Sequence, residues 1–213
     1  KALNIMVLEN KYKIIKFDPE ILREYDIRGI VDENINENTA YTIGRTFGSI
    51  VKSKTNSNKV VTGYDGRLTS PKLHKALCVG LKDAGLNVIN VGIGPTPMIY
   101  FADHHFNCDA AVMVTGSHNP SEYNGFKIVF RKHSFFSDDI QNLQSLINVN
   151  NLKILKGNIN KQEIIDPYVN RNLKNIKIQK PLKIAWDTGN GAMGVIINKI
   201  ICNLKNTTNI IIN

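Results

Sequence analysis

The sequence predicts a layered α/β/α domain built on a mixed sheet, followed by the start of a second, similar α/β domain. Short runs of small and β-branched apolar residues alternate with longer stretches in which apolar residues recur every three or four positions. This alternation is typical of proteins whose helices cover both faces of a sheet. The order of strand, turn with aspartate and glycine, and helix returns after residue 180, which indicates the second domain.

The first residues contribute little to this pattern. Residues 1–16 are predicted to be a poorly ordered leader, because their apolar patch is short and no small-residue cleavage site of a secretory signal follows it. Residues 17–29 are predicted to be irregular, ending at Gly29, and to carry Tyr25 and Arg28 as polar side chains. The first domain is therefore expected to begin at Phe17.

A helix is predicted over residues 36–53, where one face holds Ile43, Phe47, Ile50 and Val51. Gly44 and Gly48 lie near this face and suit close packing on a sheet. A second helix is predicted from Ser70, read as its N-cap before Pro71, to Gly85 just past its end.

The remaining elements of the first domain follow the same logic. Strands are predicted at 59–63, 87–91, 110–114 and 126–130, and a helix at 96–105. Ser137 is predicted to cap a last helix whose apolar side holds Ile140, Leu143 and Ile147. The first domain is thus expected to cover residues 17–150.

Residues 151–213 are predicted to be a linker and an incomplete second domain. The stretch 148–161 is rich in asparagine and lysine, as linkers often are. After it, helices are predicted at 166–176 and 194–204, and strands at 182–186 and 209–212. These form one βαβ unit, a small core for a separate domain.

Composition narrows the function classes. The net charge is +9, but the lysines are spread along the chain and form no zinc-finger or recognition-helix pattern, so a nucleic-acid partner is not expected. No apolar run is long enough to span a membrane. Three widely spaced cysteines, Cys78, Cys108 and Cys202, are read as free buried thiols in a reducing compartment, which predicts a cytoplasmic protein.

The chemistry is expected in the stretch Thr115-Gly-Ser-His-Asn-Pro120 with Asn124-Gly-Phe-Lys127 behind it. It follows the apolar run Ala110–Val114, and loops at strand ends are where α/β proteins bind ligands. A serine hydroxyl, an imidazole, an amide and an ammonium group thereby come together. The two glycines allow the backbone to approach a ligand closely or to adopt positive φ.

Serine alone is a poor nucleophile, so Ser117 requires a base, a metal or a phosphoryl group. A serine–histidine hydrolase is one alternative, since His118 is adjacent. Against it, neighbouring side chains at a strand end usually point apart, and the chain has no Gly-x-Ser-x-Gly elbow at this serine.

A longer string decides between these alternatives. The loop and the following Tyr123-Asn-Gly-Phe-Lys127 resemble the active-site loop of the phosphohexomutases, the phosphomannomutase/phosphoglucomutase family. Four further segments resemble landmarks of that family in the same order: Glu24-Tyr-Asp-Ile-Arg-Gly29, Gly63-Tyr-Asp-Gly-Arg67, Gly94-Pro-Thr-Pro97 and Asp187-Thr-Gly-Asn-Gly191. The resemblance extends from Phe17 to the end of the chain and identifies it as the N-terminal portion of such a protein.

The resemblance implies an isomerase that moves phosphate between C1 and C6 of mannose or glucose through a phosphoserine enzyme and a 1,6-bisphosphate. By resemblance, the catalytic residues are Ser117, which carries the phosphoryl group, His118, Lys127 and Arg28. His118 is a candidate general acid or base, and Lys127 and Arg28 supply positive charge to the transferring group.

The same resemblance implies how substrate and metal bind. Tyr25, Arg28, Asn119 and Lys127 are the expected substrate-binding residues, with a hexose phosphate and its bisphosphate as ligands. Mg²⁺ is the expected cofactor, and Ser117 the one metal-contacting residue, through its phosphate.

The chain also departs from the family pattern. The metal loop, an Asp-Gly-Asp-x-Asp-Arg string, is absent from the sequence, as are the later sugar-binding and phosphate-binding loops. The chain is therefore expected to be truncated, to need the missing C-terminal domains and to be inactive alone. The alternative is a phosphosugar-binding or assembly fragment without turnover.

Overall fold

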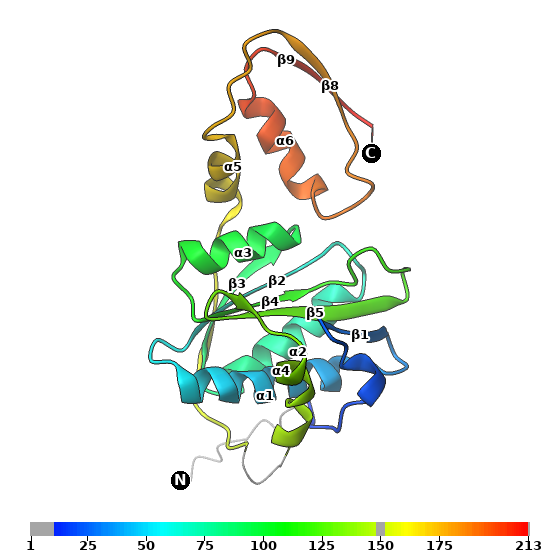
Figure 1. Cartoon of the computed structure of the whole chain (residues 1–213), viewed down its shortest axis with the longest axis vertical. Helices are drawn as coiled ribbons and strands as arrows, with labels where there is room; N and C mark the ends of the chain where they lie inside the picture. The colour runs from blue at the N-terminus through cyan, green and yellow to red at the C-terminus, as the bar shows by residue number, and fades with distance from the viewer. Residues whose placement is uncertain (1–10, 148–151, 213) are drawn as a thin grey trace, which may run out of the picture.

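The computed structural model describes residues 11–147 and 152–212, which form a larger α/β body and a smaller unit stacked on it (Figure 1). The strands are β1 Ile27–Ile30, β2 Lys59–Tyr64, β3 Asn87–Ile93, β4 Ala110–Val114, β5 Tyr123–Phe130, β6 His133–Ser134, β7 Asn158–Lys161, β8 Leu182–Trp186 and β9 Thr207–Ile211. The helices are α1 Glu37–Lys54, α2 Ser70–Asp83, α3 Thr96–His105, α4 Asp138–Gln141, α5 Ile165–Leu173 and α6 Gly194–Asn203, with 3₁₀ turns at Pro19–Ile21 and Gln144–Leu146.

The main sheet is mixed, as the sequence predicts. Its strand order is β1-β5-β4-β2-β3-β7, with β6 paired to β5. The strands β4, β2, β3 and β7 run parallel, whereas β5 is antiparallel to both β4 and β1. The two central strands β2 and β4 therefore end at the same edge of the sheet, and the loops that follow them meet there.

Helices cover both faces of this sheet and confirm the α/β/α layering. In Figure 1, α1, α2 and α4 lie on one face and α3 on the other, with α5 and α6 beyond α3. One core joins α1 and α2 to the sheet through residues such as Phe47, Leu77 and Phe126. A second core joins α3 to the smaller unit through residues such as Ile99 and Ile196.

The contact between α1 and α2 corrects the role predicted for two glycines. Gly44 and Gly48 face α2 and not the sheet. A Cβ atom on Gly44 would lie 2.5 Å from the carbonyl oxygen of Leu77, and one on Gly48 would lie 2.6 Å from the Ala84 side chain. Their missing side chains allow the two helices to pack backbone to backbone.

The N-terminal part of the domain is more ordered than predicted. Residues 1–10 of the expected leader lie outside the described residues, but Tyr12 is buried and stacks on Tyr41. The irregular segment predicted up to Gly29 overlaps strand β1, which pairs with β5 in the register Arg28 to Gly125. Arg28 therefore lies on the sheet and not on a loop.

Further corrections concern helix starts and strand ends. Ser70 is the first residue of α2 and its hydroxyl donates to Asp65, so it does not cap the helix. Ser137 makes no side-chain cap bond, and the helix after it is the short α4 followed by a 3₁₀ turn. Strand β5 begins at Tyr123, three residues before the predicted start, and β6 was not predicted.

The segment predicted as a linker contributes to the main sheet. Within residues 148–161, the last four form β7, which pairs in parallel with β3. Residues 148–151 lie outside the described residues. Beyond β7, the helix α5 and the parallel pair β8–β9 with α6 agree with the predicted βαβ unit, although α5 ends at Leu173, before the predicted Ile176.

Two of the three cysteines are buried. Cys78 and Cys108 are free and buried, and burial raises the pKa of each thiol to about 12. Cys202 is free but exposed, contrary to the prediction that all three are buried. Among residues 11–147 and 152–212, no helix combines the length and apolar character needed to cross a bilayer.

A buried histidine predicts acid sensitivity of the fold. His74 on α2 is 4% exposed, with its Nε2 3.0 Å from Thr62 Oγ1 and 3.4 Å from Cys78 Sγ. Burial lowers the pKa of His74 from 6.5 to about 4. As the pH falls, the unfolded chain therefore takes up this proton before the folded chain does, so His74 does not reduce the free energy of unfolding at pH values above the unfolded pKa of 6.5. The free energy of unfolding should fall by about 3 kcal/mol as the pH decreases from 6.5 to about 4.

Urea unfolding at about pH 7 and about pH 4.5 tests this expectation, since the slope of stability with pH reports the protons bound differently by the two states. His74→Phe should lose that part of the pH dependence. His104→Gln, at an exposed histidine of α3, is the matched control and should keep it. An equal pH dependence in wild type and His74→Phe would contradict the assignment.

Candidate functional site

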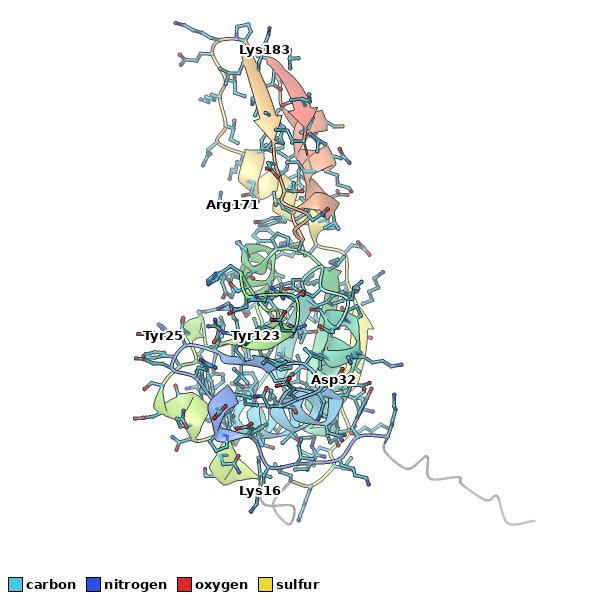
Figure 2. All side chains as sticks on the ribbon, turned by 90° about the vertical axis from the view of Figure 1, so that its right-hand side faces the viewer. Lys16, Tyr25, Asp32, Tyr123, Arg171 and Lys183 are labelled. Atoms are coloured by element: carbon cyan, nitrogen blue, oxygen red, sulfur yellow. The ribbon has the colours of Figure 1, made fainter. Side chains whose placement is uncertain are left out.

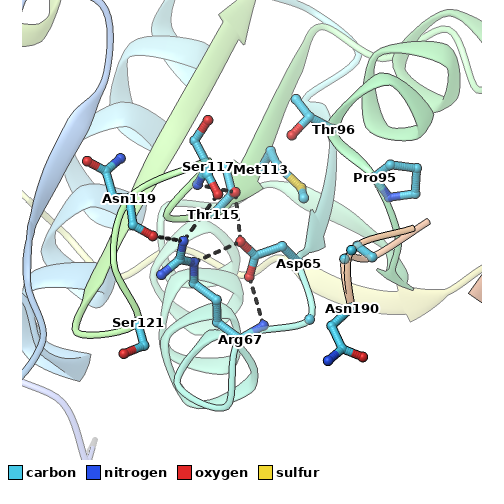
Figure 3. A pocket seen from close by; sticks show the side chains of 14 residues that line it. Asp65, Arg67, Pro95, Thr96, Met113, Thr115, Ser117, Asn119, Ser121 and Asn190 are labelled. Atoms are coloured by element: carbon cyan, nitrogen blue, oxygen red, sulfur yellow. Dashed lines mark hydrogen bonds and ion pairs between the residues drawn. The ribbon is translucent and has the colours of Figure 1, made fainter. Parts of the chain in front are cut away.

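A cleft opens where β2 and β4 end, and the predicted serine lies in it (Figure 3). Its volume is about 480 Å³, in the range of small-molecule sites. Four segments line it, at 65–67 after β2, 95–96 at the start of α3, 113–121 around the end of β4, and 189–192 before α6. We call residues 115–122, between β4 and β5, the serine loop.

Asp65 fixes the start of the serine loop. Its Oδ2 accepts hydrogen bonds from Thr115 Oγ1 at 2.7 Å and from the Gly116 N–H at 3.2 Å. Its Oδ1 accepts from Ser70 Oγ at 2.6 Å and from the Arg67 N–H at 3.1 Å. One carboxylate thus joins the end of β2, the start of α2 and the serine loop.

Ser117 lies at the exposed surface of the cleft in a left-handed backbone conformation, with φ of 55°. Its N–H donates to Thr115 Oγ1 at 2.8 Å. Its Oγ is 3.4 Å from His118 Nδ1. The two side chains therefore approach each other, whereas the sequence predicted that they would point apart. The unusual φ turns the chain at Ser117 and allows the adjacent imidazole to approach the hydroxyl.

Asn119 connects the serine loop to the predicted cations. Its Nδ2 donates to the Gly116 carbonyl at 2.8 Å, which closes the turn around Ser117. Its Oδ1 accepts from Arg28 Nη1 at 3.2 Å. Arg28 on β1 is thereby held against the loop that carries the serine.

Arg28 and Lys127 share one buried counter-ion, Asp26. The carboxylate of Asp26 accepts from Arg28 Nη2 at 3.1 Å and from Lys127 Nζ at 3.0 Å. Asp26 is 5% exposed, whereas both cations are partly exposed. The cluster carries a net charge of +1 at one side of the serine loop, which favours an anionic ligand.

The predicted site residues therefore meet only in part. Ser117 and Asn119 line the cleft, and His118 contacts the serine. Arg28 joins them through Asn119. Lys127 joins through Asp26. Tyr25 is 71% exposed and lies at the side of the larger body, where it lines no part of this cleft (Figure 2).

Three residues that hold the site were not among those predicted for it, namely Asp26, Asp65 and Arg67. Asp65 and Arg67 follow a predicted strand, so their place at the edge of the sheet was a usable signal. Asp26 was in a recognised string, but its pairing with Lys127 depends on the unpredicted strand β1. Arg67 donates four hydrogen bonds to carbonyl oxygens in and next to the serine loop.

The acidic side chains do not form a metal cage. In the part of the chain that the structure describes, no three His, Cys, Asp or Glu side chains converge as metal ligands would. Asp65 and Asp26 are already engaged by the groups described above. The acidic side chains of the described residues therefore do not make up a magnesium site by themselves.

Known proteins share this architecture. The chain matches the family model "Phosphoglucomutase/phosphomannomutase, alpha/beta/alpha domain I" over residues 19–152. It is 42% identical over 181 residues to a phosphomannomutase/phosphoglucomutase of Pseudomonas putida, covering 85% of this chain and 39% of the relative. It is 36% identical over 189 residues to a phosphoglucomutase of Neisseria meningitidis, covering 88% of this chain and 41% of the relative.

A solved structure shares both fold and sequence. The crystal structure of a phosphoglucomutase/phosphomannomutase family protein from Burkholderia thailandensis aligns with a TM-score of 0.84 at 36% identity, covering 92% of this chain and 44% of that protein. The chain thus spans about two fifths of the length of the relatives it matches.

Proposed function

Because the chain belongs to the phosphoglucomutase/phosphomannomutase family, we propose that the protein carrying it is a phosphohexomutase that interconverts hexose 1-phosphates and hexose 6-phosphates. The observation that carries the proposal is the geometry of Ser117. Its hydroxyl faces a cleft, while its backbone is bound by Thr115 and its loop by Asp65. A fixed, accessible hydroxyl is what an enzyme requires to accept and donate a phosphoryl group.

The proposed reaction has two transfers through Ser117. In the first, the bond between Ser117 Oγ and phosphorus breaks as a free hydroxyl of the hexose monophosphate forms its own bond to that phosphorus, giving the 1,6-bisphosphate. In the second, the other phosphoryl group leaves the sugar and returns to Ser117 Oγ. The hydroxyl proton lost in the first transfer is returned to the sugar oxygen in the second, so atoms and charges balance.

His118 is proposed to hold that proton. Its Nδ1 is 3.4 Å from Ser117 Oγ, close to the oxygen at which one bond to phosphorus is made and broken. Proton transfer by a placed side chain typically contributes about a hundredfold to ten-thousandfold in rate.

Arg28 and Lys127 are proposed to bind the phosphate that is not being transferred and to offset charge on the one that is. Asn119 orients Arg28. The exposed Tyr25 is proposed to meet the sugar from outside the cleft. The unit from α5 onwards is proposed to belong to a second domain, whose residues 189–192 form one wall of the cleft.

A magnesium ion is proposed as the cofactor. Bound at the phosphorylated Ser117, such an ion would supply charge neutralisation for the phosphoryl group. A cytoplasmic location and mannose or glucose phosphates as substrates complete the proposal.

A serine–histidine hydrolase is a second candidate, favoured by the Ser117–His118 contact. A fluorophosphonate probe separates the two, because it labels serines activated by a base. No label at Ser117 is expected from a phosphohexomutase, whereas stoichiometric labelling would support the hydrolase.

Turnover tests the proposal directly. The protein carrying this chain, given Mg²⁺ and a trace of glucose 1,6-bisphosphate, should convert mannose 1-phosphate or glucose 1-phosphate into the 6-phosphate at about 1 to 1000 per second. Tight binding of these sugars without turnover would instead favour a non-catalytic phosphosugar-binding protein. Lack of both would contradict either function.

A further inference from the structure

The guanidinium of Arg67 is the centre of the backbone contacts of the serine loop (Figure 3). Its Nη2 donates to the carbonyl oxygens of Ser117 at 3.1 Å and Asn119 at 2.6 Å. Its Nη1 donates to those of Pro120 at 2.6 Å and Tyr123 at 3.0 Å. Arginine presents its donors in a rigid planar fork, and the three donors of a lysine leave from one point, so a lysine could not reach all four acceptors.

Besides Arg67, the serine loop is held by the bonds of Thr115 and Gly116 to Asp65, by the bond of the Ser117 N–H to Thr115, and by the bond of Asn119 Nδ2 to the Gly116 carbonyl. Within it, the N–H of Asn119 donates to the Gly116 carbonyl, and the N–H of Tyr123 to the Pro120 carbonyl. Proline has no N–H to contribute. The left-handed conformation of Ser117 costs about 1 to 2 kcal/mol, which the surroundings must offset. The bonds to Arg67 are the largest set of contacts that can do so.

Charge gives Arg67 a second effect on the same loop. A phosphorylated serine carries about −1.5 to −2 charges, and unpaired carbonyl oxygens beside it would repel the phosphate. Arg67 donates hydrogen bonds to four carbonyl oxygens in and next to the loop, which weakens this repulsion. Its Nε lies 3.4 Å from Asp65 Oδ2, which orients the guanidinium. Gly116 leaves it room, since a Cβ there would lie 2.4 Å from Arg67 Cζ.

We propose that Arg67 is the positioning residue of the serine loop, which holds Ser117 Oγ toward the cleft before any phosphoryl group arrives. The inference rests on the proposed function of Ser117. Both terminal nitrogens of Arg67 are bound to backbone oxygens, so the residue acts through the loop and not on the substrate. Its loss should therefore lower kcat and leave KM for the hexose phosphate nearly unchanged.

Hydrogen exchange on the 213-residue chain tests the structural half. In Arg67→Lys, the amides of Ser117, Asn119 and Tyr123 should exchange at least about tenfold faster than in wild type. Gly116→Ala, which displaces Arg67 from the other side, should have the same effect. Arg131→Lys, at an exposed arginine that donates to the Lys54 carbonyl, is the matched control. Unchanged exchange in both Arg67→Lys and Gly116→Ala would overturn the inference.

Phosphorylation tests the functional half in the protein that carries this chain. With glucose 1,6-bisphosphate and Mg²⁺, the rate of phosphate transfer to Ser117 should be about tenfold to a hundredfold lower in Arg67→Lys than in Arg131→Lys. In Arg67→Ala, added methylguanidinium should restore part of the rate. If wild type acquires phosphate on Ser117 and the Arg67 variants acquire it at the same rate, this inference alone is overturned. Wild type that never acquires phosphate on Ser117 would overturn the proposed function first.

Discussion

Replacing Ser117 with alanine is expected to abolish mutase turnover, by about a thousandfold or more, as losses of a covalent nucleophile do. The fold should be retained. The side chain is exposed, and its backbone N–H still donates to Thr115 Oγ1 in the variant. The free energy of unfolding should therefore change by no more than about 0.5 kcal/mol.

Ser121→Ala is the matched control, because Ser121 is also an exposed serine that lines the same cleft. Peptide mapping after incubation with glucose 1,6-bisphosphate should place the phosphate on Ser117 in wild type and in Ser121→Ala. Phosphate on any other residue, with Ser117 unmodified, would refute the assignment.

The elements that the sequence predicted well are those that local pattern determines. Helix α2 has Pro71 in its first turn and an apolar face around Leu77, and β4 is a continuous apolar run. Both signals lie within the element itself. Strand β1 has only four residues, Ile-Arg-Gly-Ile, and it forms because β5 lies beside it. Such pairing is non-local, and the sequence of a short polar or glycine-containing segment does not predict it.

Strand β7 illustrates the same limit on an edge of the sheet. Its sequence, Asn-Ile-Asn-Lys, is polar and reads as a linker, yet its backbone pairs with β3. An edge strand has one partner and faces water, so its side chains need not be apolar. Composition therefore identified the exposure of this segment correctly and its structure wrongly.

The candidate site divides in the same way. Ser117 and its loop could be located because a buried strand, a glycine and a cluster of polar residues follow one another in the sequence. The counter-ion Asp26 could not, since Arg28 and Lys127 meet it only after β1 and β5 have paired. The contacts of Arg67 with four carbonyl oxygens likewise depend on the shape of a loop fifty residues further on.

Removing Arg28 or Lys127 is expected to lower turnover by about a hundredfold to a thousandfold, about 3 kcal/mol of transition-state stabilisation for each charge lost. Each single variant, Arg28→Ala or Lys127→Ala, should remain folded, because Asp26 keeps one of its two cationic partners. The pattern in kcat and KM then distinguishes their roles, since a group that binds substrate and transition state equally raises KM alone.

The double variant Arg28→Ala with Lys127→Ala should behave differently from the sum of the two. It leaves the carboxylate of Asp26, 5% exposed, without either cation, and an unpaired buried charge typically costs about 3 to 5 kcal/mol. Adding Asp26→Asn to the double variant should restore most of that stability without restoring turnover. Thermal or urea unfolding with activity measured on the same samples separates the two effects. A Lys127→Ala variant that unfolds, and whose folded fraction is fully active, would show that Lys127 serves the fold and not the phosphate.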